Sequence, residues 1–176
     1  MTPADALPPD RRKARTREAV LEAMRQLLFT RRYGAIRAGE LIARADVGRS
    51  TFYEHFRSKD EVLAALIDPL FSPLADAAAG RGNVHAVEAA LAHLWEQRAA
   101  ARGLLEAPPG PRLARKLAGM IAERMGDRTT EAPPALAAAG AAAAALAVLG
   151  AWLGGGAPCR PIDLAREMVG LRRGPG

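Results

Sequence analysis

Residues 37–56 read RAGELIARADVGRSTFYEHF and contain two short helical patterns separated by a break. In the first pattern, over about residues 38–45, Leu41 and Ile42 are apolar. In the second, over residues 49–56, Phe52 and Phe56 are four positions apart and therefore share one helix face. Asp46-Val47-Gly48 lies between them and breaks the helical pattern. The stretch therefore predicts a helix, a sharp turn and a second helix.

The second helical pattern combines an apolar face with a polar one. Its other side chains can form hydrogen bonds and are of a size that reaches phosphates and base edges: Arg49, Ser50, Thr51, Tyr53 and His55. Ser58 and Glu61 have the spacing of a capping box for the next helix, and Lys59 lies at that helix's start, where free amides favour an anion. A helix-turn-helix places its second helix in the major groove of DNA. Spacing and side chains together predict a DNA-binding motif.

The rest of the chain also follows helical periodicity, and no segment alternates like a half-buried strand. We expect residues 1–10 to form a disordered arm and residues 11–57 the helix-turn-helix domain, with Asp10 as N-cap of its first helix. Residues 58–79 are expected to form a connecting helix that Pro69 and Pro73 kink or end. Residues 80–176 read as a helical bundle. The predicted fold class is all α, with a three-helix head and a C-terminal bundle.

Composition excludes several classes of protein. The 176 residues carry a formal net charge of +6, and Arg greatly outnumbers Lys. Arginine suits phosphate contacts, although a GC-rich genome would produce the same excess. A single cysteine, Cys159, forms no internal disulfide, and the N-terminus lacks the apolar run of a secretory signal. Because no nucleotide-binding motif, nucleophile pair or zinc-ligand cluster is visible, we expect no enzyme activity, no cofactor and no metal.

Residues 132–159 contain no charged side chain. The run exceeds the roughly 20 residues that a membrane-spanning helix needs. Most of it is alanine and glycine, however, and alanine buries too little apolar area to partition strongly into lipid. A helix that is apolar on all sides is embedded in lipid or buried in protein. We favour burial in a protein bundle or subunit interface, with no membrane contact.

The motif region resembles the DNA-binding domain of the TetR/AcrR family of bacterial transcriptional regulators. That family has the pattern Thr-[Leu/Phe]-Tyr-x-His-Phe-x-x-Lys-[Glu/Asp] here. The matching residues of this chain are Thr51, Phe52, Tyr53, His55, Phe56, Lys59 and Asp60. Tyr33 also fits, near the end of the first helix, and the resemblance covers about residues 11–66. It implies a homodimer of all-helical subunits, with residues 80–176 as the ligand-binding and dimerisation domain.

The resemblance also implies roles for the polar residues of the motif. Tyr53 and His55 are expected to contact phosphates of a double-stranded DNA operator, and Lys59 to do the same from the fourth helix. Arg49, Ser50 and Thr51 occupy positions that contact bases or phosphates. The alternative for Tyr53 and His55 is a packed tyrosine and a histidine at a helix end.

Three residues depart from the family pattern. Arg37 stands where a threonine usually caps the first helix of the motif, Asp46 replaces the turn glycine, and Gly48 replaces a serine that caps the second helix. Arg37 is then available to a phosphate, and we count it among the DNA-binding residues. Asp46 can still adopt the left-handed backbone conformation that the turn needs.

The C-terminal region is less specific. Its large side chains are candidates for an effector pocket or for plain core, and the pocket candidates are His93, Trp95, Met120 and Trp152. By the resemblance, the last two helices of each subunit form the dimer interface, which we assign to Gly140, Ala144, Leu149, Trp152, Leu164 and Met168.

The expected function is that of a sequence-specific transcriptional regulator. We expect a repressor that binds a palindromic operator as a homodimer and is released by a small, apolar effector. It is expected in the bacterial cytoplasm, at the nucleoid when bound to DNA. The alternative is a helical protein-interaction module whose degenerate helix-turn-helix does not read DNA.

Overall fold

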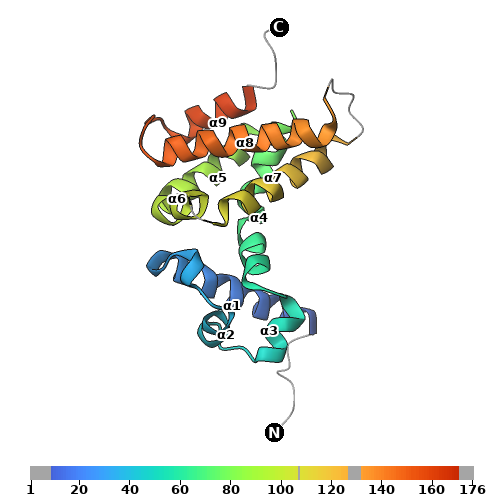
Figure 1. The fold of residues 1–176 in the computed structure, drawn as a ribbon, viewed down its shortest axis with the longest axis vertical. Helices are drawn as coiled ribbons and strands as arrows, with labels where there is room; N and C mark the ends of the chain where they lie inside the picture. The colour runs from blue at the N-terminus through green and yellow to red at the C-terminus, as the bar shows by residue number, and fades with distance from the viewer. Residues whose placement is uncertain (1–8, 107, 127–131, 171–176) are drawn as a thin grey trace. The chain divides into compact units, whose positions relative to one another are not determined.

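The computed structural model describes residues 9–106, 108–126 and 132–170, and all regular structure in these residues is helical (Figure 1). The predicted all-α class is confirmed. In chain order the elements are α1 (Pro9–Thr30), the 3-10 turn η1 (Tyr33–Ala35), α2 (Ala38–Arg44), α3 (Arg49–His55), α4 (Lys59–Ala78), α5 (Val84–Glu96), α6 (Arg98–Glu106), α7 (Gly110–Met125), α8 (Pro134–Leu153) and α9 (Pro161–Gly170). The chain divides into two compact units between Leu66 and Ile67, so α4 belongs to both.

The first unit, called the head below, is built around large apolar side chains. Leu41 of α2 and Phe52 of α3 have no exposed surface, and Phe56, which follows α3, is 1% exposed. The rings of Phe52 and Phe56 lie 6.1 Å apart. The predicted apolar face of the second motif helix is thus the face that packs inward. Helix α1 begins at Pro9, so Asp10 lies in its first turn and is not the N-cap that we expected; most of the predicted arm lies outside the described residues.

The turn of the motif accommodates the three departures from the family pattern. Asp46 adopts a φ of 52°, the left-handed conformation expected of it. The backbone N–H of Arg37 donates to Oε2 of Glu40 at 2.9 Å, so Glu40 caps the start of α2 in place of the missing threonine. Gly48 occupies the N-cap position of α3 and offers no side-chain oxygen. At α4, Ser58 Oγ accepts from the Glu61 N–H at 3.3 Å, which is one of the two bonds of the expected capping box. The Glu61 carboxylate accepts from the Arg57 N–H at 2.5 Å, one residue before the position that the box requires.

Two prolines lie inside α4 without ending it. We expected Pro69 and Pro73 to end or kink the helix, but it continues to Ala78 as one element. Contacts with α7 help to hold this part of α4: Lys116 pairs with Asp68 at 2.6 Å, and Arg124 pairs with Asp76 at 2.7 Å. Both acidic and both basic residues are eight positions apart, so α4 and α7 run in the same direction over this contact. The helix thus continues through both prolines, and two ion pairs join this segment to α7.

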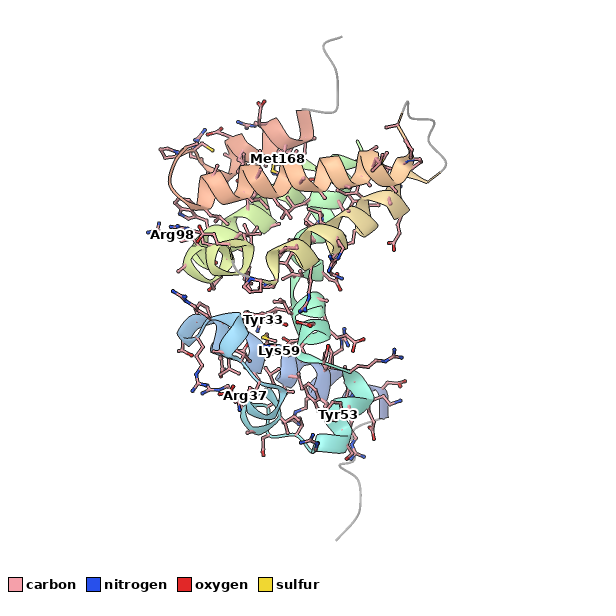
Figure 2. All side chains as sticks on the ribbon, viewed as in Figure 1. Tyr33, Arg37, Tyr53, Lys59, Arg98 and Met168 are labelled. Atoms are coloured by element: carbon pink, nitrogen blue, oxygen red, sulfur yellow. The ribbon has the colours of Figure 1, made fainter. Side chains whose placement is uncertain are left out.

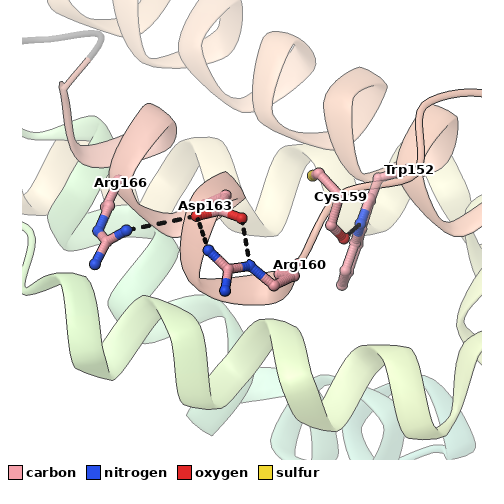
Figure 3. A network of polar contacts seen from close by, with 5 residues as sticks. All are labelled: Trp152, Cys159, Arg160, Asp163 and Arg166. Carbon is pink, nitrogen blue, oxygen red and sulfur yellow. Dashed lines mark hydrogen bonds and ion pairs between the residues drawn. The ribbon is translucent and has the colours of Figure 1, made fainter.

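The second unit, called the core below, is a helical bundle in which α7 packs on α8 and α5 on α9. The alanine-rich α8 buries one face. Trp152, in its last turn, is 2% exposed and lies against Trp95 with ring centroids 4.8 Å apart. The indole N–H of Trp152 donates to the Cys159 carbonyl at 3.0 Å, fastening the loop that leads into α9 (Figure 3). Helix α5 ends at Glu96 and α6 begins at Arg98, a break that periodicity alone did not reveal.

Candidate DNA-binding surface

The polar face of α3 is open to solvent. Arg49 and Ser50, in its first turn, are exposed, and Tyr53 is 43% exposed. The Tyr53 ring meets Phe52 edge-on at 5.3 Å, and the Arg49 guanidinium lies 5.6 Å from the Tyr53 ring centroid. The ring is therefore held from two sides while its surface remains accessible. This arrangement favours a contact role for Tyr53 over burial in the core.

The remaining residues predicted around the motif differ in exposure. Thr51 and His55 are half-buried, and the His55 ring lies 6.5 Å from that of Phe56. Arg37 is exposed, and its guanidinium has no hydrogen bond or ion pair with any residue that the structure describes. The Glu40 carboxylate caps α2 by accepting from the Arg37 backbone N–H, so the Arg37 side chain is not needed for capping. It can contact solvent or a phosphate.

Lys59 is placed differently from the other predicted contacts. Its ammonium donates to the carbonyl oxygens of Tyr33 at 3.1 Å and Ile36 at 2.7 Å, and lies 4.6 Å from the Tyr33 ring centroid. The structure therefore does not bring the Lys59 ammonium together with the polar face of α3. Figure 2 shows Lys59 beside Tyr33 and away from Tyr53. The motif pattern revealed that these residues belong to the head, but not that they contact each other.

The core contains a small, partly open cavity and a larger groove. The cavity has a volume of about 30 Å³ and is lined by apolar side chains of α4 to α8, among them Phe71, Leu94 and Leu104. The groove has a volume of about 350 Å³ and lies between α4, α8 and α9, with Leu74, Ala144 and Met168 in its lining.

The predicted pocket residues do not form one site. His93 is exposed, Met120 is half-buried, and Trp95 and Trp152 stack on each other. The linings of the cavity and the groove include none of these four residues. The structure thus separates the candidate set. Helical spacing identified large side chains correctly, but not which helices face each other.

The predicted dimer-interface residues divide into two groups. Gly140 and Ala144 are exposed on α8 and line the groove. Leu149 and Trp152 are 1% and 2% exposed, and Leu164 and Met168 are each 8% exposed, so these four side chains are buried within the subunit. Their assignment to a surface contact is corrected: they lie on the faces of α8 and α9 that pack inward.

Much of α8 remains uncovered. Its mean hydropathy reaches 2.0 and its 20 residues are long enough to cross a membrane, but core helices of soluble proteins meet the same criterion. Only 33% of its apolar window is buried within the subunit. Leu136 and Val148 are 65% and 36% exposed on this helix. The uncovered face carries no charge and includes Gly140 and Ala144.

No group of three or more potential metal ligands occurs among the residues that the structure describes. Cys159 is exposed. The polar chemistry of the candidate site therefore consists of hydrogen-bonding and cationic side chains on a small helical scaffold, which is suited to recognition of a polyanion.

Comparison with known proteins gives matches over the same part of the chain. Residues 20–66 match the family described as "Bacterial regulatory proteins, tetR family". The HTH-type transcriptional regulator EthR of Mycolicibacterium smegmatis (strain ATCC 700084 / mc(2)155) is 39% identical over 86 residues, which are 49% of this chain and 36% of that protein. The uncharacterized HTH-type transcriptional regulator YxbF of Bacillus subtilis (strain 168) is 36% identical over 59 residues, 33% of this chain and 16% of that one. The chain thus spans about a third or less of the length of these relatives.

Solved structures resemble the chain over most of its length. A TetR transcriptional regulator from Streptococcus agalactiae 2603V has a TM-score of 0.56 and 24% identity, and the likeness covers 92% of this chain and 96% of that one. The dihydroxyacetone kinase operon activator DhaS has a TM-score of 0.55 and 19% identity, with coverages of 89% and 93%. At these identities the likeness establishes the fold.

Proposed function

The chain belongs to the tetR family of bacterial regulatory proteins, and from this premise we propose that it is a transcriptional regulator that reads double-stranded DNA with α3. One observation carries the proposal. Helix α3 buries Phe52 against the head while its first turn exposes Arg49 and Ser50. A recognition helix needs this division, because its apolar face fixes its orientation and its N-terminal residues approach base edges in the major groove.

The exposed residues of the head fall into two roles. Arg49 and Ser50 are placed to reach base edges, where an arginine fork pairs well with guanine. The phosphate contacts come from the residues around them, which are Arg37, Thr51, Tyr53 and His55. Contacts to phosphates set affinity and register, whereas contacts to bases set sequence preference.

The regulator acts as a homodimer through the uncovered face of α8. A face that combines Leu136 and Val148 with small residues, and carries no charge, is unfavourable in water. Gly140 and Ala144 permit close approach of a second copy of the same helix, and a twofold axis matches such a face with itself. Two recognition helices held in this way suit a palindromic operator, whose half-sites are about 34–36 Å apart.

The effector of the proposed repressor is small and apolar. The partly open cavity of about 30 Å³ is lined by leucines, an isoleucine, an alanine and Phe71, whereas sites for drug-sized ligands have volumes of about 300–1,000 Å³. An effector therefore enters by displacing side chains around the cavity, including those of α4. It releases the DNA if it binds the altered state more tightly, and DNA must weaken effector binding by the same factor.

The remaining assignments follow from this function. The protein is placed in the bacterial cytoplasm, at the nucleoid when bound to DNA, and without membrane contact because a second subunit covers α8. It needs no cofactor and is not an enzyme. The alternative is a helical protein-interaction module that does not read DNA, and the following experiment distinguishes it from a regulator.

Binding to duplex DNA from upstream of the chain's own gene tests the proposal, with a scrambled duplex as competitor and several salt concentrations. Preferential, salt-dependent binding of two protomers per site is expected. Arg49→Ala should alter operator preference, while Tyr53→Phe should weaken binding to all sequences. If a genome-wide selection with the purified protein recovers no preferred sequence, the head does not read DNA.

Ala144→Glu tests the dimer. The substitution introduces a charge at an exposed position of α8, on the rim of the groove. We expect monomers in sedimentation equilibrium, with helix content unchanged. Ala99→Glu, on the exposed part of α6, is the matched control and should remain dimeric. A variant at residue 144 that dimerises like the control would place the interface elsewhere.

A further inference from the structure

The first turn of α4 is tied to η1 and Ile36 by two consecutive side chains. Lys59 donates to the Tyr33 and Ile36 carbonyls and faces the Tyr33 ring. Asp60, the next residue, accepts the hydroxyl proton of Tyr33 in a hydrogen bond. We call Tyr33, Lys59 and Asp60 the latch. Figure 2 shows two of its members, Tyr33 and Lys59, side by side.

The latch acts on backbone that leads directly into the DNA-binding motif. Tyr33 and Ile36 are 5% and 0% exposed, so their carbonyls have little access to water. The Tyr33 carbonyl also accepts a hydrogen bond from the Ile36 N–H. Among the residues that the structure describes, the Ile36 carbonyl accepts a hydrogen bond from Lys59 alone. A buried carbonyl without a donor is destabilising, because it loses its hydrogen bonds to water and gains none in the protein. Lys59 therefore stabilises the conformation of Ile36, and the next residue, Arg37, is the N-cap of α2.

This placement competes with a phosphate contact. An ammonium has three N–H groups, and two of them are engaged with carbonyls in the head. If Lys59 turned toward a phosphate, it would lose its hydrogen bond to the Ile36 carbonyl and its contact with the Tyr33 ring. The loss of these two interactions would offset part of the free energy gained from the phosphate contact. The resemblance implied a phosphate contact for Lys59, whereas the geometry favours a role inside the head.

We propose that Lys59 is a positioning residue for DNA recognition: with Tyr33 and Asp60 it fixes the entry of α2, and so the angle at which α2 and its turn present α3. The inference rests on the proposed function, because positioning matters only if α3 reads DNA. It assigns Tyr33, which is buried and touches no DNA, a measurable share in operator affinity.

The test compares Lys59→Met with Tyr33→Phe and with the double variant, on duplex DNA from upstream of the chain's own gene and on a scrambled duplex. Lys59→Met removes the charge and keeps much of the stem. Tyr33→Phe removes only the hydroxyl that Asp60 accepts and alters no charge. Arg37→Met is the control, since it removes one positive charge from an exposed site of the same unit.

A latch predicts that Tyr33→Phe and Lys59→Met both lower affinity for the upstream duplex, by about 5-fold or more, and more than for the scrambled one. The double variant should lose less than the product of the two single losses, because both break one structure. The logarithmic salt slope of Lys59→Met should stay closer to that of the wild type than the slope of Arg37→Met, for which a lost phosphate contact lowers it by about 0.9.

Other outcomes overturn the latch. If Tyr33→Phe binds like the wild type while Lys59→Met loses the same salt slope as Arg37→Met, Lys59 contacts phosphate. If Lys59→Met does not fold, the affinity of Tyr33→Phe decides alone. Amide hydrogen exchange in the first turn of α2, measured without DNA, should accelerate in both latch variants. If the wild type shows no DNA preference, the proposed function fails, whereas unchanged exchange in both variants refutes the latch itself.

Discussion

The head and the core are both helical, but different side chains hold them together. In the head, a few large residues at fixed spacings fill the interior, Phe52 and Phe56 foremost, and polar groups join separate elements. In the core, α8 is mostly alanine and glycine, and the largest anchor is the Trp95–Trp152 pair. A helix with a few large apolar residues on one side can turn only that side inward. A helix with alanine on every side can turn any of several faces inward. The contrast explains why the motif is readable along the chain and the core is not.

The two units also use cations differently. Lys59 of the head satisfies backbone carbonyls. In the core, Arg124 donates to Asp76 at 2.7 Å, Ser72 at 2.8 Å and the Met120 carbonyl at 3.0 Å. Lys59, at the start of α4, binds backbone of the segment that precedes α2. Arg124 binds the part of α4 that contains the prolines. The following substitutions test whether the units depend on these features separately.

Trp152→Ala should have the largest effect. It removes a side chain that is 2% exposed and its bond to the Cys159 carbonyl, so we expect a loss of about 3–5 kcal/mol. Urea unfolding followed by circular dichroism measures the loss, and Trp152→Phe, which keeps a ring against Trp95, should lose less. Amide exchange in α1 to α3 should stay protected in the folded variant. Equal acceleration in both units would mean that they unfold as one.

Arg124→Met should destabilise the core by about 1–2 kcal/mol, because the side chain is 19% exposed and its three partners lose a charged donor. Arg124→Lys keeps the charge but not the planar fork, and is expected to recover only part of the loss. Arg37→Met in the head, where the guanidinium has no described partner, should change the free energy of unfolding by less than about 0.5 kcal/mol. Similar losses at residues 37 and 124 in urea titrations would contradict the distinction.

Asp46→Gly should stabilise the head slightly. Asp46 has a φ of 52°, which glycine adopts without the steric penalty of a Cβ, and we expect a net gain of about 0.5 kcal/mol after the greater chain entropy of glycine is included. Asp46→Val should instead destabilise by about 1–2 kcal/mol. Thermal unfolding of both variants provides the measurement. A valine variant as stable as the wild type would show that the turn does not need this conformation.

The smallest expected effect is a pH dependence at the start of α9. Hydrogen bonds from Arg160 lower the pKa of Asp163 from its ordinary value, and Arg160 and Arg166 both lie beside the carboxylate (Figure 3). Because the pKa is lowered in the folded state, the contribution is present above the unfolded pKa and is lost as pH falls through the folded value. Arg160→Gln should raise the pKa of Asp163 in a carboxyl NMR titration at low salt. An unmoved pKa of Asp163 would exclude the pairing in solution.

Prediction from sequence succeeded where local chemistry has one solution. The left-handed Asp46 turn and the capping bond from the Glu61 N–H to Ser58 Oγ both agree with the structure. Of the two expectations for Pro69 and Pro73, an end of the helix was wrong, because α4 continues through both prolines to Ala78, where two ion pairs join it to α7. The break at Gln97 between α5 and α6 has no proline or glycine to mark it.

By itself, the sequence determined the all-α class, the helix-turn-helix and the polar face of α3, because periodicity, turn residues and the spacing of Phe52 and Phe56 act over a few residues. The tertiary structure alone decided which face of α8 is uncovered and where the Lys59 ammonium lies. The sequence of an alanine-rich helix does not favour one inward face, so the helices that pack against it determine which face is buried. A long, flexible lysine side chain likewise goes to whichever acceptors the fold brings within reach, and here these are the carbonyls of Tyr33 and Ile36.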